Sequence, residues 1–296
     1  MVFDEYINVN DDRLMNGLIP VVRIMQRAAV SGEEALRIDF SHTKFISPVF
    51  ALSLIVFLSK SGRKYSFANL NEYLSIIGLG SGGIRPDRMR KSEFLATMEG
   101  YVRKTFIPIV NFPAKADTDE KDIISSVVEN LIIRQLNIPP NVAIGLKYMI
   151  EETLDNITEH SDSDRGFIFA QAYPNKGYLD LCIADRGVSL LGSYQRIPDN
   201  EIASDLEAIE AANRGFSSKN LPNAENRGYG IYTSKKMLTE GLGGQYLLLS
   251  GSSFYLKTPG FNSFYSLPNG LRWNGTIVAF RIPYNVDKFN YINYIE

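Results

Sequence analysis

The feature that most constrains the fold is an almost wholly apolar run, Val49 to Leu58, in the first third of the chain. At about ten residues it is too short to cross a bilayer, which takes about 20 residues. Ser47 and Pro48 precede the run and Ser59-Lys60-Ser61-Gly62 follows it, so turn-forming residues bound it on both sides. The run is therefore predicted to be a core helix, residues 48–60.

Around this helix the first third of the chain alternates between strand and helix signals. We expect strands at residues 35–40 and 65–69, and a short helix at 72–77 that Gly78 and Gly80 close. Such alternation predicts a parallel sheet. Proline, small residues and an acidic cluster at 111–120 indicate a border, which we place near residue 105. The predicted domains are residues 1–105 and 106–296.

The second part has a different pattern, with helices first and strands mostly later. The predicted helices are residues 120–136, 141–160, 200–212 and 230–239, and the predicted strands are 166–172, 178–184, 245–250, 253–257 and 275–282. A polar loop at 213–227 separates the last two helices. Helices on one side of an antiparallel or mixed sheet make an α+β sandwich, which is the predicted fold class.

Composition excludes several classes of protein. Hydrophobic residues make up 45% of the chain and the net charge is -2, so we expect a folded protein without the basic surface that a nucleic-acid partner requires. Cys182 is the only cysteine, which excludes a disulfide framework and a thiolate zinc site within one chain. The N-terminus is mixed and charged, unlike a targeting segment, so we expect no membrane insertion and a cytoplasmic location.

Three polar side chains share one face of the helix predicted at 141–160. Glu152, Asn156 and His160 are four residues apart, and such positions drift by only about 80 degrees around a helix. A carboxylate, an amide and an imidazole in line are costly to bury. The face is therefore either a solvated surface or part of a site. For His160, a satisfied imidazole at the helix end is the alternative, since a positive charge suits a helix C-terminus.

Two glycine-containing segments follow. Asp185-Arg186-Gly187 comes directly after a predicted strand, where a carboxylate can accept a hydrogen bond from an exocyclic amine. Arg227-Gly228-Tyr229-Gly230 precedes a predicted helix, whose free N–H groups and dipole favour a phosphate. Taken alone, the first segment is an ordinary turn and the second is a weak motif.

The order and spacing of these segments resemble the GHKL ATPase superfamily of histidine kinases, gyrase-type ATPases, heat-shock chaperones and anti-sigma kinases. The resemblance covers residues 110–284. The matching residues are Glu152, Asn156, Asp185, Gly187, Gly228, Gly230, Gly275 and Thr276. The segment 215–219, which ends in Lys219, resembles the lid of that family. Two positions depart from the pattern: Ser189 stands where the first glycine box has a second small residue, and Tyr232 replaces the third glycine of the second box.

The resemblance implies a Bergerat-type sandwich, with helices on one face of a mixed sheet, that binds ATP or ADP with Mg²⁺. Asn156 would supply a neutral oxygen to the metal, and Glu152 would accept a proton from the group that attacks the γ-phosphate. Asp185 would bind the adenine amine, with Thr276 as a second polar contact. The remaining implied ligands, which would hold the phosphates, are Lys219, Arg227, Gly228 and Gly230, with Gly187 beside the base.

Residues 35–80 resemble a STAS domain, the fold of anti-sigma-factor antagonists. The resemblance lies in a strand ending Ile-Asp-Phe-Ser, the long apolar helix and a later helix ending Ile-Ile-Gly-Leu-Gly. That family carries a phosphorylatable serine in an Asp-Ser-Ser-Gly signature, where this chain has Ser47-Pro48-Val49-Phe50. We expect this part to regulate or recruit. Ser47 is then a helix N-cap, and the alternative is that it substitutes as phosphoacceptor.

These resemblances favour a magnesium-dependent ATP-binding signalling regulator related to anti-sigma serine/threonine kinases. The alternative is an ATP-gated switch or slow ATPase that acts on a protein partner without phosphotransfer. Both functions need the same nucleotide site, so residues alone do not separate them. We expect a regulatory protein partner, and a homodimer is the other assembly considered. A sensor histidine kinase fits poorly, because His42 follows a strand instead of lying on a long dimerisation helix.

Overall fold

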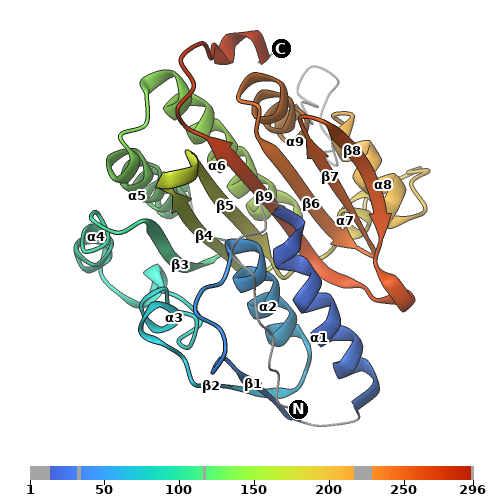
Figure 1. The fold of residues 1–296 in the computed structure, drawn as a ribbon. Coiled ribbons are helices and arrows are strands. Elements are labelled where there is room, and N and C mark those ends of the chain that lie inside the picture. Colours follow the sequence, from blue (N-terminus) through green and yellow to red (C-terminus); the bar gives the residue numbers. More distant parts are fainter. Residues whose placement is uncertain (1–13, 32–34, 116–117, 217–228, 295–296) are drawn as a thin grey trace.

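The structure is a computed structural model that describes residues 14–31, 35–115, 118–216 and 229–294. Its centre is a seven-stranded sheet, accompanied by a separate two-stranded sheet (Figure 1). The large sheet has the strand order β3-β4-β5-β9-β6-β7-β8, and all of its neighbouring strands are antiparallel. The protein therefore belongs to the α+β class. The predicted mixed sheet is wrong in this respect, because the parallel pair is confined to the small sheet.

The described N-terminal part contains the predicted strand–helix–strand–helix order, with two further α-helices and two 3-10 helices. Its elements are η1 (Leu14–Gly17), α1 (Leu18–Ser31), β1 (Ala35–Asp39), α2 (Pro48–Lys60), β2 (Lys64–Ala68), α3 (Glu72–Ile76), η2 (Pro86–Arg88) and α4 (Lys91–Glu99). β1 and β2 pair in parallel, as predicted. The helices α1 and α4 were not predicted.

The second part supplies the large sheet and the helices that cover one of its two faces. Its elements are β3 (Phe106–Pro113), α5 (Thr118–Leu136), α6 (Pro140–His160), β4 (Arg165–Tyr173), η3 (Pro174–Lys176), β5 (Tyr178–Asp185), α7 (Leu190–Tyr194), α8 (Asp205–Asn213), α9 (Tyr229–Lys236), the π-helical turn η4 (Met237–Gly241), β6 (Gln245–Gly251), β7 (Ser253–Thr258), β8 (Phe261–Ser266), η5 (Pro268–Gly270), β9 (Trp273–Pro283) and η6 (Tyr291–Tyr294).

Three differences from the sequence prediction concern the start of one helix and the positions of two strands. The helix predicted at 200–212 begins only at Asp205, because the Ser204 hydroxyl caps it by accepting from the Glu207 amide at 3.2 Å. β3 occupies part of the predicted border. β8 was not predicted.

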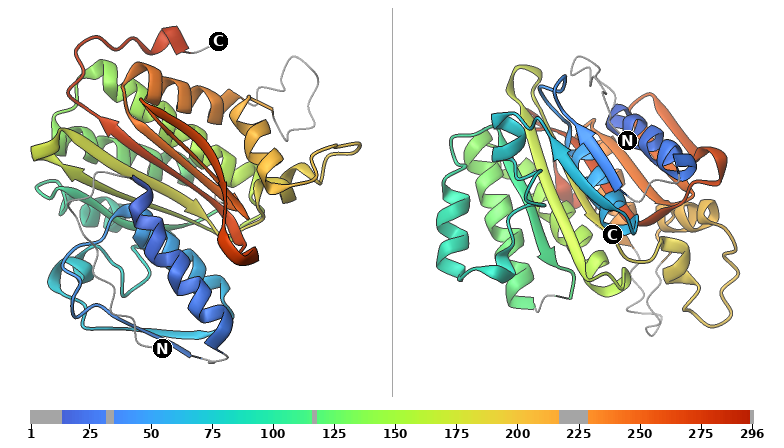
Figure 2. Two further views of the ribbon diagram at one scale, coloured as in Figure 1. Left: turned by 45° about the vertical axis from the view of Figure 1, so that its right-hand side comes forward. Right: turned by 90° about the horizontal axis from the view of Figure 1, so that it is seen from below.

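The helices cover the large sheet on both faces (Figure 2). α1 and α2 pack on one face, where α2 contacts β4, β5 and β9. α5 and α6 pack on the opposite face, together with α8 and α9. The apolar cluster under α2 joins residues from both sides of position 105, such as Leu52 and Leu249. The N-terminal helices therefore bury their apolar surface against the sheet of the second part.

α2 has the bounds that the sequence predicts. The Ser47 hydroxyl accepts a hydrogen bond from the Phe50 amide at 3.3 Å, and Pro48 occupies the first turn, where no donor is needed. A Cβ atom at Gly17 would lie 2.3 Å from the Ser47 hydroxyl oxygen, so η1 packs directly over this cap. Ser47 is thus held as an N-cap beneath another segment. In the described part of the chain, no helix has the length and apolar character needed to span a membrane.

Candidate functional site

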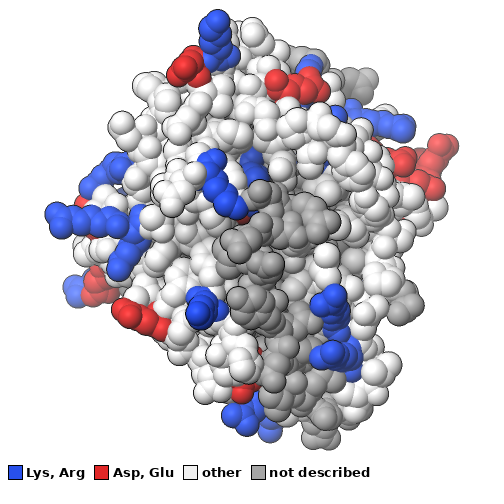
Figure 3. Space-filling view, viewed as in Figure 1, with Lys and Arg blue, Asp and Glu red and all other residues white. Residues whose placement is uncertain are grey.

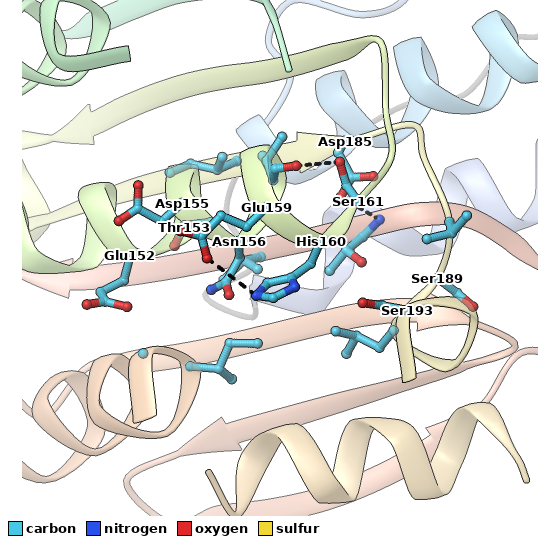
Figure 4. A pocket seen from close by; sticks show the side chains of 18 of the residues that line it. Glu152, Thr153, Asp155, Asn156, Glu159, His160, Ser161, Asp185, Ser189 and Ser193 are labelled. Carbon is cyan, nitrogen blue, oxygen red and sulfur yellow. Dashed lines mark hydrogen bonds and ion pairs between the residues drawn. The ribbon is translucent and has the colours of Figure 1, made fainter. Parts of the chain in front are cut away.

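A cavity of about 340 Å³ lies between α6, the ends of β5 and β9, α7 and the start of α9. Five of the predicted site residues line it: Glu152, Asn156, Asp185, Gly230 and Thr276. Its volume lies within the range of small-molecule sites. Figure 4 shows that Glu152, Asn156 and His160 of α6 face this space, with Ser189 and Ser193 on another side of it. These five residues are therefore brought together from four elements that are far apart in the sequence.

The polar stripe of α6 forms one wall of the cavity. Glu152, Asn156 and His160 all line it, so this face is not simply a solvated surface. The imidazole of His160 is 19% exposed, and its Nε2 lies 3.7 Å from the Glu159 carboxylate. Asp155, on the same helix, is paired with Lys121 of α5.

Tyr148 extends this stripe by one turn and was missed by sequence reasoning. Its hydroxyl donates a hydrogen bond to the Glu152 carboxylate and accepts one from Thr233 of α9. Burial and the nearby Glu152 charge raise the pKa of Tyr148 to about 12, so the hydroxyl keeps its proton. The signal was present in the sequence, because Tyr148 lies four residues before Glu152.

Asp185 ends β5 and is only 2% exposed. Its carboxylate accepts hydrogen bonds from the backbone amides of Gly187 at 2.7 Å and Thr276 at 3.1 Å. Burial raises the pKa of Asp185 to about 7, and these two amide bonds only partly offset the effect. A carboxylate has about four acceptor sites, so two amides leave capacity for a ligand.

Close backbone contacts explain the glycines. A Cβ atom at Gly187 would lie 1.9 Å from the Ser161 carbonyl oxygen, and one at Gly230 would lie 2.1 Å from the Glu152 carboxylate. Gly275 has a φ of +92°, and a Cβ atom there would lie 2.3 Å from the Asp185 carbonyl oxygen. Gly230 itself lines the cavity, whereas Gly187 and Gly275 do not line it. The predicted site residue Gly187 instead lies against Ser161, and Gly275 lies against Asp185, which are two lining residues.

A second polar network contacts Ser189, which lines the cavity. Asp205 is 4% exposed and accepts from Arg272 at 2.6 Å and from the Ser252 amide at 2.9 Å. Ser189, one of the departures from the family pattern, caps α7 and lies 3.3 Å from Asp205 and 3.1 Å from Arg272. Sequence reasoning missed Asp205 and Arg272, since residues so distant in the chain leave no local pattern.

Three predicted phosphate ligands, Lys219, Arg227 and Gly228, lie outside the described residues. Polar contacts hold the chain just before them. The Tyr194 hydroxyl, at the cavity wall, donates to the Phe216 carbonyl at 2.7 Å, and the Lys235 ammonium donates to the Asn213 carbonyl at 2.7 Å. Burial lowers the pKa of Lys235 to about 8. Tyr232, the other departure, has its ring 5.2 Å from this ammonium.

Cys182 is fully buried in β5, and burial raises the pKa of its thiol, as expected for an inert side chain. Among the described residues, no group of three or more histidine, cysteine or acidic side chains is arranged to hold a metal ion. No protein-family model matches the chain, and a search of curated proteins finds no significant match.

Proposed function

We propose that the chain binds ATP and ADP with Mg²⁺ in this cavity and acts as a signalling regulator of the anti-sigma kinase type. One observation carries the proposal: Glu152, Asn156, Asp185, Gly230 and Thr276 line a single cavity. Their side chains and backbone come from α6, β5, α9 and β9. An ordered motif that merely matched by accident would have no reason to converge in this way.

The finer fold assignment belongs to the same proposal. We assign residues 106–296 to a Bergerat-type nucleotide-binding domain and residues 1–105 to a STAS-like regulatory domain. The first assignment is supported by the order of α6, β5, α9 and β9 around the cavity. The second is supported by the parallel pair β1 and β2, connected through α2.

Asp185 and Thr276 would recognise the adenine base. The Asp185 carboxylate is buried and fixed by two amides, so it would accept from the exocyclic amine without having to reorganise. The Thr276 hydroxyl lies 3.2 Å from the Ser250 hydroxyl, which also accepts from the Leu190 amide at 2.9 Å. This fixed polar surface favours a base that presents a donor and disfavours guanine, whose carbonyl would meet a carboxylate.

Asn156 and Glu152 would act at the phosphate end. Asn156 offers an amide oxygen, a ligand type suited to Mg²⁺, which would neutralise phosphate charge when bound. Glu152 lies one turn away, and Tyr148 orients its carboxylate from the preceding turn. The carboxylate is therefore fixed for accepting a proton from an attacking hydroxyl or water. This arrangement favours phosphotransfer or hydrolysis.

A switch without phosphotransfer is the second candidate, and one contact favours it. Tyr194 lines the cavity and donates to the Phe216 carbonyl, at the last described residue before position 217. A nucleotide that displaced Tyr194 would therefore change the chain at this point. Phosphotransfer and switching differ only in the fate of the γ-phosphate.

Calorimetry with ATP and GTP, with and without Mg²⁺, tests nucleotide binding. Wild-type protein should bind ATP and discriminate against GTP, and Asn156→Ala should lose the Mg²⁺-dependent part of the affinity. Asn130→Ala is the matched control, because the Asn130 side chain bonds only the Ser126 carbonyl on α5. Equal affinities for ATP and GTP would disprove the adenine assignment.

Incubation of the purified protein with labelled ATP and Mg²⁺, followed by analysis of the products, separates the two candidates. Phosphoprotein indicates a kinase, free phosphate indicates an ATPase, and bound but unchanged nucleotide indicates a switch. Phosphate on Ser47 would contradict the regulatory role of residues 1–105.

A further inference from the structure

The two edges of the seven-stranded sheet differ in how the chain covers them. At the β3 edge, the Ile84 amide donates to the Ile109 carbonyl at 2.7 Å, and the Asn111 amide donates to the Ile84 carbonyl at 2.8 Å. The Ile109 amide also donates to the Ile77 carbonyl at 2.9 Å. At the opposite edge, β8 pairs with β7 alone among the strands that the structure describes.

The pairing with β7 shows which backbone groups of β8 face outward. Ser253 lies opposite Ser266, and the Leu267 amide donates to the Ser252 carbonyl at 2.7 Å. Because hydrogen-bonding residues alternate along an antiparallel strand, Tyr265 and Ser263 also face β7. The N–H and C=O groups of the remaining residues, Asn262, Phe264 and Ser266, therefore point away from the sheet. Such a row is a template for another strand.

Within its own residues, β8 lacks two of the usual protections against pairing, which are charged side chains and proline. No charged residue occurs between Thr258 and Leu271, and β8 itself contains no proline. The Phe261 side chain is 45% exposed, and Asn262 and Ser266 are also exposed. In Figure 3, which has the view of Figure 1, the surface over β7 and β8 is largely uncharged. An uncharged edge can approach an identical one without electrostatic repulsion.

We propose that β8 pairs antiparallel with β8 of a second copy of this chain, about a twofold axis at Ser263. The seven-stranded sheets of the two copies then form one continuous sheet of fourteen strands. In this register Asn262 of one copy exchanges backbone hydrogen bonds with Phe264 of the other. Ser263 faces its own symmetry mate as a non-hydrogen-bonded pair.

Aromatic side chains lie at equal distances on either side of Ser263, which favours a second copy as the occupant. Phe261 and Tyr265 lie two residues before and after Ser263, on one face of the sheet, where their rings stack with centroids 6.4 Å apart. The twofold axis places each Phe261 opposite the Tyr265 of the other copy. Phe254 of β7 stacks on Tyr265 at 4.9 Å, so the aromatic row would continue across the interface.

Cysteine cross-linking tests the register in the full-length chain. Cys182 is fully buried, so Ser263→Cys adds the accessible thiol at a position predicted to face itself. Opposed Cα atoms in such a pair are about 4.5 Å apart, within disulfide range. Mild oxidation should convert Ser263→Cys to covalent dimer. Ser266→Cys is the matched control, because its symmetry mates would be about 20 Å apart and should stay monomeric on denaturing gels.

Sedimentation equilibrium tests the backbone pairing. Wild type and Asn262→Ser should be dimers, whereas Asn262→Pro should be monomeric, because proline removes an outward N–H and no bond to β7. Circular dichroism should show the same secondary structure in all three. A monomeric wild type, a dimer that survives Asn262→Pro, or a Ser263→Cys dimer that does not cross-link would overturn the proposal. No nucleotide is used, so the outcome is independent of the proposed ATP site.

Discussion

β5 carries two buried aspartates that have different surroundings. Asp180 faces the α2 side of the sheet, and both of its oxygens accept from Arg281 of β9, at 2.8 and 2.9 Å. Asp185 faces the cavity side and accepts from the two backbone amides of Gly187 and Thr276. Both residues are at most 2% exposed. Among the described side chains, no cation forms an ion pair with Asp185.

The difference separates a structural charge from a candidate binding charge. The guanidinium of Arg281 satisfies Asp180 within the chain, and the aromatic ring of Tyr178 covers the pair at 4.2 Å. Burial raises the pKa of both aspartates, so the distinction lies in the partners: Asp185 has an incomplete set beside the cavity, the condition expected where a ligand completes the site. Burial alone does not identify a functional carboxylate, whereas burial with unfilled acceptor capacity beside a cavity does.

The largest expected effect is a loss of stability when the charge of Asp180, the aspartate paired with Arg281, is removed. Asp180→Asn should lower the free energy of unfolding by about 3–5 kcal/mol, because Arg281 stays buried without a counter-charge. Asp185→Asn is the matched substitution on the same strand and should cost only about 1–2 kcal/mol, since no cation loses its partner. Urea unfolding measures both changes. Equal losses would remove the distinction between the two aspartates.

Adenosine binding should depend on pH through Asp185. The amine donates to the ionised carboxylate, so a proton on Asp185 competes with the ligand. With a pKa of about 7, affinity should rise about tenfold from pH 6 to pH 8. Adenosine is a better probe than ATP for this measurement, because adenosine has no phosphate that titrates in this range. Asp185→Asn should bind more weakly and show no such slope, and a slope that persists would assign the titration to another group.

A smaller loss of stability is expected at the N-cap of α2, on the face of the sheet opposite the cavity. Ser47→Ala should lower the free energy of unfolding by about 1 kcal/mol, because the Phe50 amide loses its cap. Ser59→Ala at the other end of α2 is the control, since its hydroxyl only bonds the Val56 carbonyl within the helix. Nucleotide affinity should not change in either variant. A loss of binding in Ser47→Ala would couple this face to the cavity.

The smallest expected effect is at Tyr148. Tyr148→Phe removes the hydroxyl that donates to Glu152, so the carboxylate should be less well oriented and its pKa should rise. If the chain turns over ATP, we expect a two- to fivefold lower rate and an acidic limb displaced to higher pH, with unchanged ATP affinity. Tyr101→Phe, whose hydroxyl bonds the distant Ile76 carbonyl, is the control. A change in affinity without a change in the pH profile would contradict the assigned role.

Prediction from the sequence succeeded where the signal was local. α2 has the predicted bounds because its cap, its first-turn proline and its apolar run are adjacent in the chain. β3 was missed because Pro108 is untypical of a strand. The structure accommodates this proline at a shift of register between Ile107 and Val110, on an edge strand. α1 was missed although six of its residues are buried.

The sequence alone determined the α+β class, most of the helices and strands, and the shared face of Glu152 and Asn156, because each depends on residues within a few turns or one strand period. The tertiary structure decided which of these elements contact one another. It brought Asp185 within 3.1 Å of the Thr276 amide, placed Arg272 on Asp205, and packed α2 beneath the strands that carry the cavity. Such contacts join residues tens of positions apart, and they depend on how the sheet pairs and which faces the helices cover. No local periodicity encodes that choice, because it is made by burying all the apolar faces together.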